Sequence, residues 1–372
     1  MNMMYIEDCC EILDSMRVPI TASDRKKGEY PYYGANGIQD YVSDYIFDDE
    51  LVLLAEDGGN FGSKEKPIAY RVSGKCWVNN HAHVLKPKVG LTVDYLCYSL
   101  MFYNVEGIIN GATRQKLTQS AMRKMKIPVR TMKEQIQIVD KLNRIIRIKE
   151  QRKQELSELD TLIKARFVEM FGDPVLNPKG WETKKIIEEC ECMVPGRDKP
   201  KSFTGNIPWI TIDDLVVNGI TYKSKSELGL TEEEIAEVNR KVIPTGSVIM
   251  SCVGNLGICS IAGEDMVINQ QLHSFQCGKR LDKVFLMIYL GYRKDFMNKW
   301  ASSTTVLYMN KSVCNSIPVI IPPLSLQNEF ADFVQQIDKL RFGCRKLLAK
   351  SKNIQNLNRN TITLERSALY GK

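Results

Sequence analysis

The sequence lacks the motifs that the common enzyme classes need. It has only three histidines among 372 residues. It contains no Gly-x4-Gly-Lys-Ser/Thr phosphate loop, no Gly-x-Ser-x-Gly elbow and no His-Glu-x-x-His helix. No Asn-Pro-Pro-Tyr base-methylation motif or Pro-Asp nuclease set stands out, and we interpret His81, His83 and His273 as core or turn residues. We therefore expect a chain without catalytic residues.

Long apolar runs and cysteine pairs are also missing. The longest apolar runs, such as 317–324, are short and contain prolines, so no segment is expected to span a membrane. The first ten residues have neither the basic nor the apolar region of a signal peptide. The eleven cysteines are scattered without a Cys-x-x-Cys spacing. Reduced, buried thiols in a cytoplasmic protein without a metal site are expected.

A long helix is predicted over residues 131–170. This segment contains no Gly and no Pro, and nearly all of its residues are strong helix formers. Thr131 and Glu134 match a capping box, and Gly172 lies just beyond the end. At about 1.5 Å per residue, the helix would be roughly 50–60 Å long. A second long helix is predicted over 323–372.

The second half of the chain repeats the first. The offset between matching motifs rises from 177 to 195, so the second copy should hold about 18 additional residues near 222–241. Charge repeats as well, because 1–65 and 171–265 are net acidic whereas 66–130 and 266–322 are net basic. The matching motifs are 6–12 with 187–193, 28–32 with 205–209, 59–62 with 254–257, Asn80 with Asn269, 127–129 with 317–319, and 132–135 with 324–327.

Each copy is predicted to be an α+β block with a strand-rich core, followed by a long helix. Two amphipathic helices in one chain are expected to bury their apolar stripes on each other. A whole globular block separates them in sequence, so duplication favours an antiparallel pair. The predicted fold has two repeated globular domains, 1–130 and 171–322. They are separated by antiparallel coiled-coil helices, 131–170 and 323–372, in a pseudo-two-fold dumbbell.

Polar and aromatic side chains recur at matching places in the two copies, a pattern that suits nucleic-acid binding. Asn, Gln, Arg and Lys read base edges in the major groove, and Thr and Tyr commonly contact phosphates. Ordinary polar loop residues are the alternative interpretation at each position. The candidate contacts are Tyr32, Tyr33, Asn36, Asn60, Arg114 and Lys116 in the first copy, and Trp209, Thr211, Asp213, Asn255, Thr304, Thr305 and Lys311 in the second.

Several motifs resemble the specificity subunit of type I restriction-modification systems. In the second copy they are 205–210 (GNIPWI), 243–249 (IPTGSVI), 253–257 (VGNLG), 269–271 (NQQ) and 317–327 (IPVIIPPLSLQ). Residues 167–174 and 179–181 are similar to the family's link between the first helix and the second recognition domain. The first copy departs more, since it has Arg-Thr-Met at 130–132 where the second has Pro-Pro-Leu at 322–324.

The resemblance implies a non-catalytic, DNA-reading subunit for phage defence. Each globular block would be a target recognition domain that reads half of a bipartite site in double-stranded DNA. The helices would set the spacing and dock methyltransferase subunits, and a restriction translocase would join them. S-adenosylmethionine, ATP and Mg²⁺ would be bound by these partners, with no cofactor in this chain. The alternatives are a fused methylase–nuclease, a recognition subunit of a related DNA-modification system, and a coiled-coil scaffold that binds no DNA.

Overall fold

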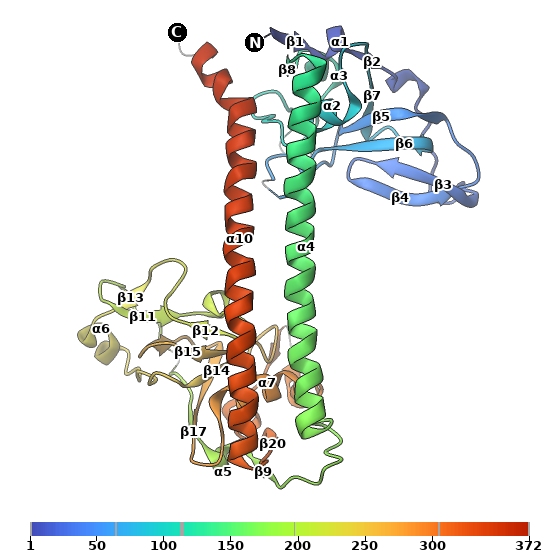
Figure 1. Ribbon diagram of the computed structural model, residues 1–372. Helices are drawn as coiled ribbons and strands as arrows, with labels where there is room; N and C mark the ends of the chain where they lie inside the picture. Colours follow the sequence, from blue (N-terminus) through green and yellow to red (C-terminus); the bar gives the residue numbers. More distant parts are fainter. Residues whose placement is uncertain (1, 64, 112–114, 197, 304–305, 371–372) are drawn as a thin grey trace. The chain divides into compact units, whose positions relative to one another are not determined.

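The computed structural model describes residues 2–63, 65–111, 115–196, 198–303 and 306–370 (Figure 1). The chain divides into two compact units. Unit 1 comprises Met1–Lys153 with Lys346–Lys372, and unit 2 comprises Gln154–Arg345. The long helices α4 (Met132–Phe171) and α10 (Leu324–Tyr370) each contribute to both units. Among the described residues, no helix combines the length and the apolar character needed to cross a membrane.

Unit 1 is built on a six-stranded sheet in the order β2-β7-β5-β6-β3-β4 (Figure 1). Strand β5 buries both of its faces, because Val52 and Leu54 belong to one core cluster whereas Leu51 and Leu53 belong to another. The larger cluster includes α2 (Val93–Leu100) and the first turns of α4. The strands are β2 (Cys10–Ile12), β3 (Lys27–Gly34), β4 (Gly37–Val42), β5 (Phe47–Ala55), β6 (Ala69–Val78) and β7 (Ala82–Pro87).

Short elements close unit 1 around the entry to α4. Strand β1 (Asn2–Tyr5) pairs antiparallel with β8 (Lys126–Val129), which leads directly into that helix. The amide of Ile6 donates to the carbonyl of Met125 (2.9 Å) beside this pair. The remaining elements are α1 (Ile6–Cys9), η1 (Asp14–Met16) and α3 (Gln119–Arg123).

Unit 2 has a five-stranded sheet, β10-β17-β14-β15-β12, and a three-stranded sheet, β13-β11-β16. Its strands are β10 (Cys190–Met193), β11 (Ile207–Ile210), β12 (Ile220–Thr221), β13 (Gly229–Leu230), β14 (Val248–Ser251), β15 (Cys259–Ala262), β16 (Val267–Ile268) and β17 (Leu272–Cys277). Two further pairs are β9 (Thr183–Lys185) with β20 (Pro318–Ile320) and β18 (Ser302–Ser303) with β19 (Leu307–Tyr308). The helices are α5 (Ile186–Glu189), η2 (Ile212–Asp214), α6 (Glu232–Glu237), α7 (Lys283–Gly291), α8 (Lys294–Trp300) and α9 (Lys311–Asn315).

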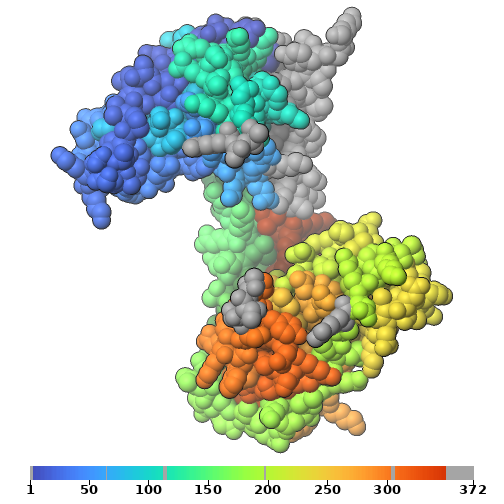
Figure 2. Space-filling model, turned by 180° about the vertical axis from the view of Figure 1, so that it is seen from behind, coloured from blue at the N-terminus to red at the C-terminus, as the bar shows by residue number. Residues whose placement is uncertain are grey.

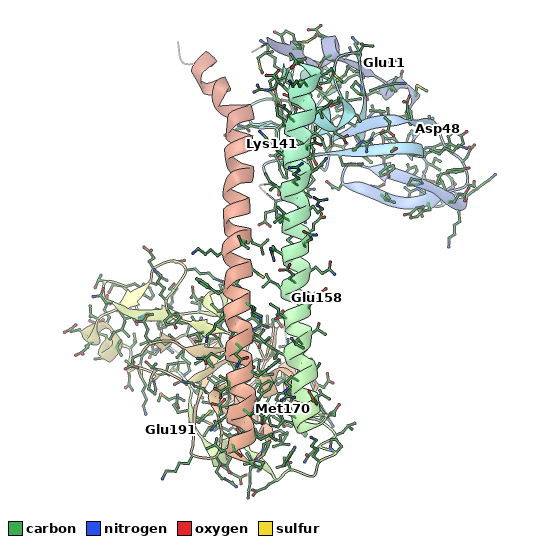
Figure 3. All side chains as sticks on the ribbon, viewed as in Figure 1. Glu11, Asp48, Lys141, Glu158, Met170 and Glu191 are labelled. Atoms are coloured by element: carbon green, nitrogen blue, oxygen red, sulfur yellow. The ribbon has the colours of Figure 1, made fainter. Side chains whose placement is uncertain are left out.

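Aromatic side chains join the long helices to the core of unit 2. The ring of Phe167 on α4 lies within 5.5 Å of the rings of Phe171, Phe285, Tyr292 and Phe330, centroid to centroid. Met170, near the end of α4 (Figure 3), belongs to the same cluster. The helix therefore belongs to the domain core as well as to the helix pair.

The segments of α4 and α10 that belong to unit 2 run antiparallel. Arg166 donates to Glu329 (2.9 Å), and Asp160 pairs with Arg341, so the residue numbers run in opposite directions along the two helices. Glu158, labelled in Figure 3, is exposed on α4 near this contact. The apolar residues that line the contact are Ile163, Phe167, Met170, Phe330, Val334 and Ile337.

The internal repeat is visible in the backbone pairing. In unit 1, β3 pairs parallel with β6 through Tyr32 and Tyr33; in unit 2, β11 pairs parallel with β16 through Trp209 and Ile210. The additional residues predicted near 222–241 form most of the segment that carries β13 and α6.

Several predicted matches in the repeat are wrong by one or two residues. The amides of Ile6 and Ile186 donate to the carbonyls of Met125 and Ile317, which aligns 6–12 with 186–192 and 125–127 with 317–319. The bridges of Asp57 and Val253 align Gly58, not Gly59, with Gly254.

The counterpart of Asn269 is Asn79, not Asn80. The amides of Asn79 and Asn269 donate to equivalent strand carbonyls. Each side-chain oxygen accepts from the backbone N–H two residues later, that of His81 (2.8 Å) or Gln271 (3.0 Å). The two adjacent asparagines look alike in sequence, but only Asn79 forms this turn.

Candidate nucleic-acid interface

In unit 1, polar groups from four chain segments meet beside the end of β5. Asn36 donates its side-chain N–H to the carbonyl of Gly58 (2.9 Å). The carboxylate of Asp57 lies 2.6 Å from Nδ1 of His81. The backbone of Asp57 also forms an antiparallel bridge with Lys116. We call Asn36, Asp57, Gly58, His81 and Lys116 loop cluster 1.

Unit 2 repeats this arrangement. Val253 and Tyr308 form the bridge equivalent to that of Asp57 with Lys116. The amide of Cys252 donates to the carbonyl of Gln271 (2.8 Å), just as Glu56 donates to His81 (2.9 Å). Asp213 follows Trp209 by four residues, as Asn36 follows Tyr32. We call Val253, Gly254, Gln271 and Tyr308, together with Asp213, loop cluster 2. Asp213 is included by its spacing from Trp209 alone, since it lies in η2 whereas Asn36 lies in the turn between β3 and β4.

Glycine at the start of each loop allows the tight turn. Gly58 has φ +62° and Gly254 has φ +71°, in the left-handed region where a side chain is strained. The amide of Gly254 donates to the carbonyl of Leu307 (2.8 Å), which fixes this loop against the segment that carries Tyr308. The loops are therefore held by backbone contacts, and their side chains are free to differ between the copies.

The two loop clusters differ in the groups that they expose. The Lys116 side chain is 48% exposed and the equivalent Tyr308 is 44% exposed. Asn36 and Asp213, each four residues after its buried aromatic residue, are also exposed. Each cluster thus offers hydrogen-bond donors and acceptors on a fixed backbone. This arrangement suits recognition of the polar edges of nucleic-acid bases. In Figure 2 the surface of unit 2 combines segments coloured from green to orange, which are far apart in sequence.

Two of the aromatic candidates are core residues. Tyr32 is 1% exposed and Trp209 is 3% exposed, so the prediction that their side chains contact DNA does not fit the structure. The Tyr32 hydroxyl donates to the carbonyl of Ile20 (3.3 Å). The guanidinium of Arg25 lies 4.3 Å from the Tyr32 ring, and that of Arg240 lies 5.3 Å from the Trp209 ring. The Tyr32 ring thus supports the segment before β3, and the Trp209 ring supports the segment after α6.

The remaining candidates are partly buried, exposed, or outside the described residues. Thr211 precedes η2, where its hydroxyl and its backbone amide both donate to the carboxylate of Asp214 (2.7 and 2.8 Å). Tyr33 is half-buried beside Tyr70, and burial raises the pKa of Tyr33. Asn60 donates to the carbonyl of Pro67 (3.4 Å). Exposed positions are occupied by Asn36, Lys116, Asp213, Asn255 and Lys311, while Arg114, Thr304 and Thr305 lie outside the described residues.

Lys116 and Lys311 do not occupy equivalent positions. Thr118 caps α3 by accepting from the amide three residues later, and Asn310 caps α9 in the same way. These caps make Lys311, the first residue of α9, the counterpart of Gln119. Lys116 corresponds instead to Tyr308. A basic group at this bridge position is therefore present in only one of the two copies.

A buried charge network that the sequence did not predict supports loop cluster 1. Ligand atoms of Asp14, Glu56 and His83 lie within 4.8 Å of one another, close enough for a metal ion. However, Glu56 already lies 2.7 Å from Arg17 and 3.0 Å from Lys116. Cationic groups thus compensate the carboxylates, which favours a structural network over a metal site.

Asp14 connects this network to the sheet. Burial alone would raise the pKa of Asp14, but hydrogen bonds and charge from His83, with the amide of Val84, hold that pKa below its ordinary value. His83 bridges the Asp14 carboxylate (2.6 Å) and the carbonyl of Leu117 (2.8 Å). The segment before Gln119 is thereby held against β7.

The equivalent histidine in unit 2 has different surroundings. His273 is buried beside the ring of Phe275 (4.7 Å between centroids). Burial lowers the pKa of His273 from 6.5 to about 4, and nearby Lys311 acts in the same direction. The position of these histidines in a repeated motif was the sequence signal for both sites, but only their neighbours distinguish a charge network from a neutral core residue.

Comparison with known proteins identifies a matching family. Residues 1–158 and 178–359 match the Type I restriction modification DNA specificity domain. A chain of Haemophilus influenzae provisionally named a type I restriction enzyme specificity subunit is 26% identical, covering 90% of this chain and 87% of that protein. The type I restriction enzyme MjaIX specificity subunit of Methanocaldococcus jannaschii is 23% identical, covering 44% of this chain and 39% of that protein.

Solved structures share the fold at low sequence identity. The type I restriction-modification S subunit from M. genitalium has a TM-score of 0.59 at 12% identity, with 96% of this chain and 94% of that one covered. A chain from a study of complex assembly and conformational transition of the type I R-M system has a TM-score of 0.55 at 16% identity, with 95% of each chain covered. The mixed α+β fold with two domains is therefore shared.

Proposed function

The chain belongs to the type I restriction-modification DNA specificity family, and from this membership we propose that loop clusters 1 and 2 each read one half of a bipartite DNA site. The chain is a specificity subunit of such a system. The observation that carries the proposal is the repeated loop geometry with different exposed side chains. Two copies of one backbone arrangement can be placed on two DNA segments, while different side chains select different bases.

The long helices are proposed to act as the spacer. In this arrangement, α4 and α10 run antiparallel between the two domains as a pseudo-two-fold dumbbell. A helix of 40 residues is about 60 Å long, which suits two half-sites separated by bases that are not read. The antiparallel contact of Arg166 with Glu329 and of Asp160 with Arg341 inside unit 2 supports the pairing.

The chemistry is proposed to belong to partner subunits. A methyltransferase subunit would bind S-adenosylmethionine, and a restriction translocase would bind ATP and Mg²⁺. Exposed apolar side chains along α4 and α10, among them Ile136, Ile148, Leu162, Leu340 and Phe342, offer a surface for these partners. The side chains of loop clusters 1 and 2 include amides, a lysine, a tyrosine and carboxylates. These groups can form hydrogen bonds with DNA, so the clusters suit binding.

Methylation-site sequencing tests the proposal. Cells that produce the chain with its methyltransferase should carry a bipartite methylated site that disappears when the chain is removed. Exchange of residues 181–317 for the block of a relative should change one half-site and retain the other. A change in both halves would contradict the assignment of one half to each domain. If the exchanged chain gives no methylation at all, its folding and its co-purification with the methyltransferase show whether the exchange disrupted the protein instead of changing its specificity.

Replacement of Lys116 tests loop cluster 1 directly. If Lys116 meets a phosphate, Lys116→Ala should weaken DNA binding and lower the slope of log K against log salt by about one. Glu56 keeps Arg17 as its partner, so the fold should persist. Lys27→Ala is the matched control, since this exposed lysine begins β3 at the end opposite Asn36. An unchanged slope in the Lys116 variant would remove that residue from the interface.

A further inference from the structure

A buried glutamine occupies the fourth position of each long helix. Gln135 on α4 and Gln327 on α10 are fully buried. They are separated by 192 residues, the offset that also relates the caps of α3 and α9. A polar amide is costly to bury unless its donors and acceptor are all satisfied. Both buried glutamines are therefore expected to be fully hydrogen-bonded.

Each glutamine makes the same three hydrogen bonds to the backbone. In unit 1, Gln135 accepts from the amide of Thr92 (2.9 Å) and donates to the carbonyls of Gly90 (2.7 Å) and Arg130 (2.9 Å). In unit 2, Gln327 accepts from the amide of Asp282 (2.9 Å). It donates to the carbonyls of Arg280 (2.9 Å) and Pro322 (2.8 Å).

These bonds join three parts of the domain at one point. The first part is the opening turn of the long helix. The second is the segment that leads into the helix from β8 or β20. The third is the loop before α2 or α7, where Thr92 and Asp282 act as N-caps. All three partners are backbone groups, so substitutions in the surrounding loops would leave the glutamine contacts in place.

We propose that Gln135 and Gln327 are positioning residues that fix the direction in which each long helix leaves its recognition domain, and thereby the half-site spacing. This inference rests on the proposed function, because spacing has meaning only if both domains read DNA. The amide is suited to the role because one planar group fixes two segments relative to the helix start. An apolar residue would fill the same space without directional bonds.

The length of the helix amplifies small changes at its base. A tilt of about 5° at the start of a helix roughly 60 Å long moves the far end by about 5 Å. This displacement exceeds the rise of one base pair, about 3.4 Å. Loss of the directional bonds at either glutamine should therefore relax the spacing by about one base pair, while leaving loop clusters 1 and 2 intact.

Binding to DNA of varied spacing tests the inference. The native site is first identified by methylation sequencing with the unchanged chain. Duplexes are then made with both half-sites and a spacer that is native, one base pair shorter or one base pair longer. The dissociation constant of the chain–methyltransferase complex is measured for each duplex. Gln135→Met and Gln327→Met, which retain side-chain length, should reduce the preference for the native spacer at least threefold.

Val248→Ala is the matched control for Gln327→Met. Val248 is fully buried in β14 and is not among the hydrogen-bond partners of Gln327, so Val248→Ala should lower stability while the three backbone bonds of Gln327 stay in place. It should retain the spacer preference of the unchanged chain. The comparison is made at temperatures equally far below the thermal midpoint of each variant, so that partial unfolding does not decide the result.

The outcomes separate the two proposals. An undiminished spacer preference in both glutamine variants would overturn the positioning role and leave the glutamines as structural residues. A relaxed preference in Val248→Ala to the same extent would also overturn it, because general destabilisation would then be sufficient. If the unchanged complex recognises no bipartite site, the proposed function itself fails.

Discussion

Acidification should destabilise unit 2 through His273. This imidazole is buried, and its Nε2 atom has no hydrogen-bond partner. Burial lowers the pKa of His273 from 6.5 to about 4. The charged form is therefore disfavoured in the folded state relative to the unfolded chain, where the imidazole is hydrated.

Proton linkage gives the sign and size of this change in the free energy of unfolding. Between pH 6.5 and 4 the unfolded chain binds more protons at this site, so the free energy of unfolding falls as the pH is lowered. Above pH 6.5 both states are neutral, and the stability is fully present. At pH 5 the loss would be about 2 kcal/mol, with a slope that approaches 1.4 kcal/mol per pH unit.

Tryptophan fluorescence can isolate unit 2. Of the four tryptophans, only Trp77 belongs to unit 1, while Trp181, Trp209 and Trp300 belong to unit 2. Urea denaturation of Trp77→Phe between pH 5 and 8 therefore reports unit 2 alone. Addition of His273→Leu should reduce the pH dependence over this range by about 2 kcal/mol.

The slope of the free energy of unfolding against pH is compared between His273→Leu and its parent. His273→Leu changes the absolute stability through packing, but a packing change is independent of pH. If the variant and its parent lose stability in parallel between pH 7 and 5, the imidazole does not titrate as the burial requires. The inference of a neutral, desolvated histidine would then be rejected.

Further predictions concern the helices. Phe167→Ala should lower the free energy of unfolding of unit 2 by about 3–5 kcal/mol in urea denaturation, because the ring is fully buried among four others. Phe342→Ala, whose side chain is 70% exposed, should change it by less than about 0.5 kcal/mol, and equal effects would contradict the core assignment. Arg341→Met should cost under about 1 kcal/mol, since Asp160 and Asp338 are accessible to water, and a loss above about 3 kcal/mol would contradict this. Four residues inserted within 147–155 add about 6 Å and should lengthen the spacer by one or two base pairs with both half-sites retained; an active variant with unchanged spacing in methylation sequencing would show that α4 does not set the distance.

The sequence by itself determined features that depend on local pattern. Helical spacing of apolar residues between two caps predicts a long helix, and α4 extends from Met132 to Phe171. Recurrent motifs predict a duplication, and the parallel pairings of β3 with β6 and of β11 with β16 repeat at the expected places. Such features are readable because helix periodicity and motif order require no knowledge of distant neighbours.

Only the tertiary structure decided which side chains are available for binding. Tyr32 and Trp209 match binding aromatics in sequence, but both are buried. Arg25 covers the Tyr32 ring, and Leu230, Ile235 and Val267 surround Trp209. Asn79 and Asn80 are indistinguishable until one forms the turn. His83 and His273 share a motif, yet Asp14 accompanies only His83, from 69 residues away. Burial and electrostatic environment depend on groups that folding brings together from distant segments, and no local pattern contains them.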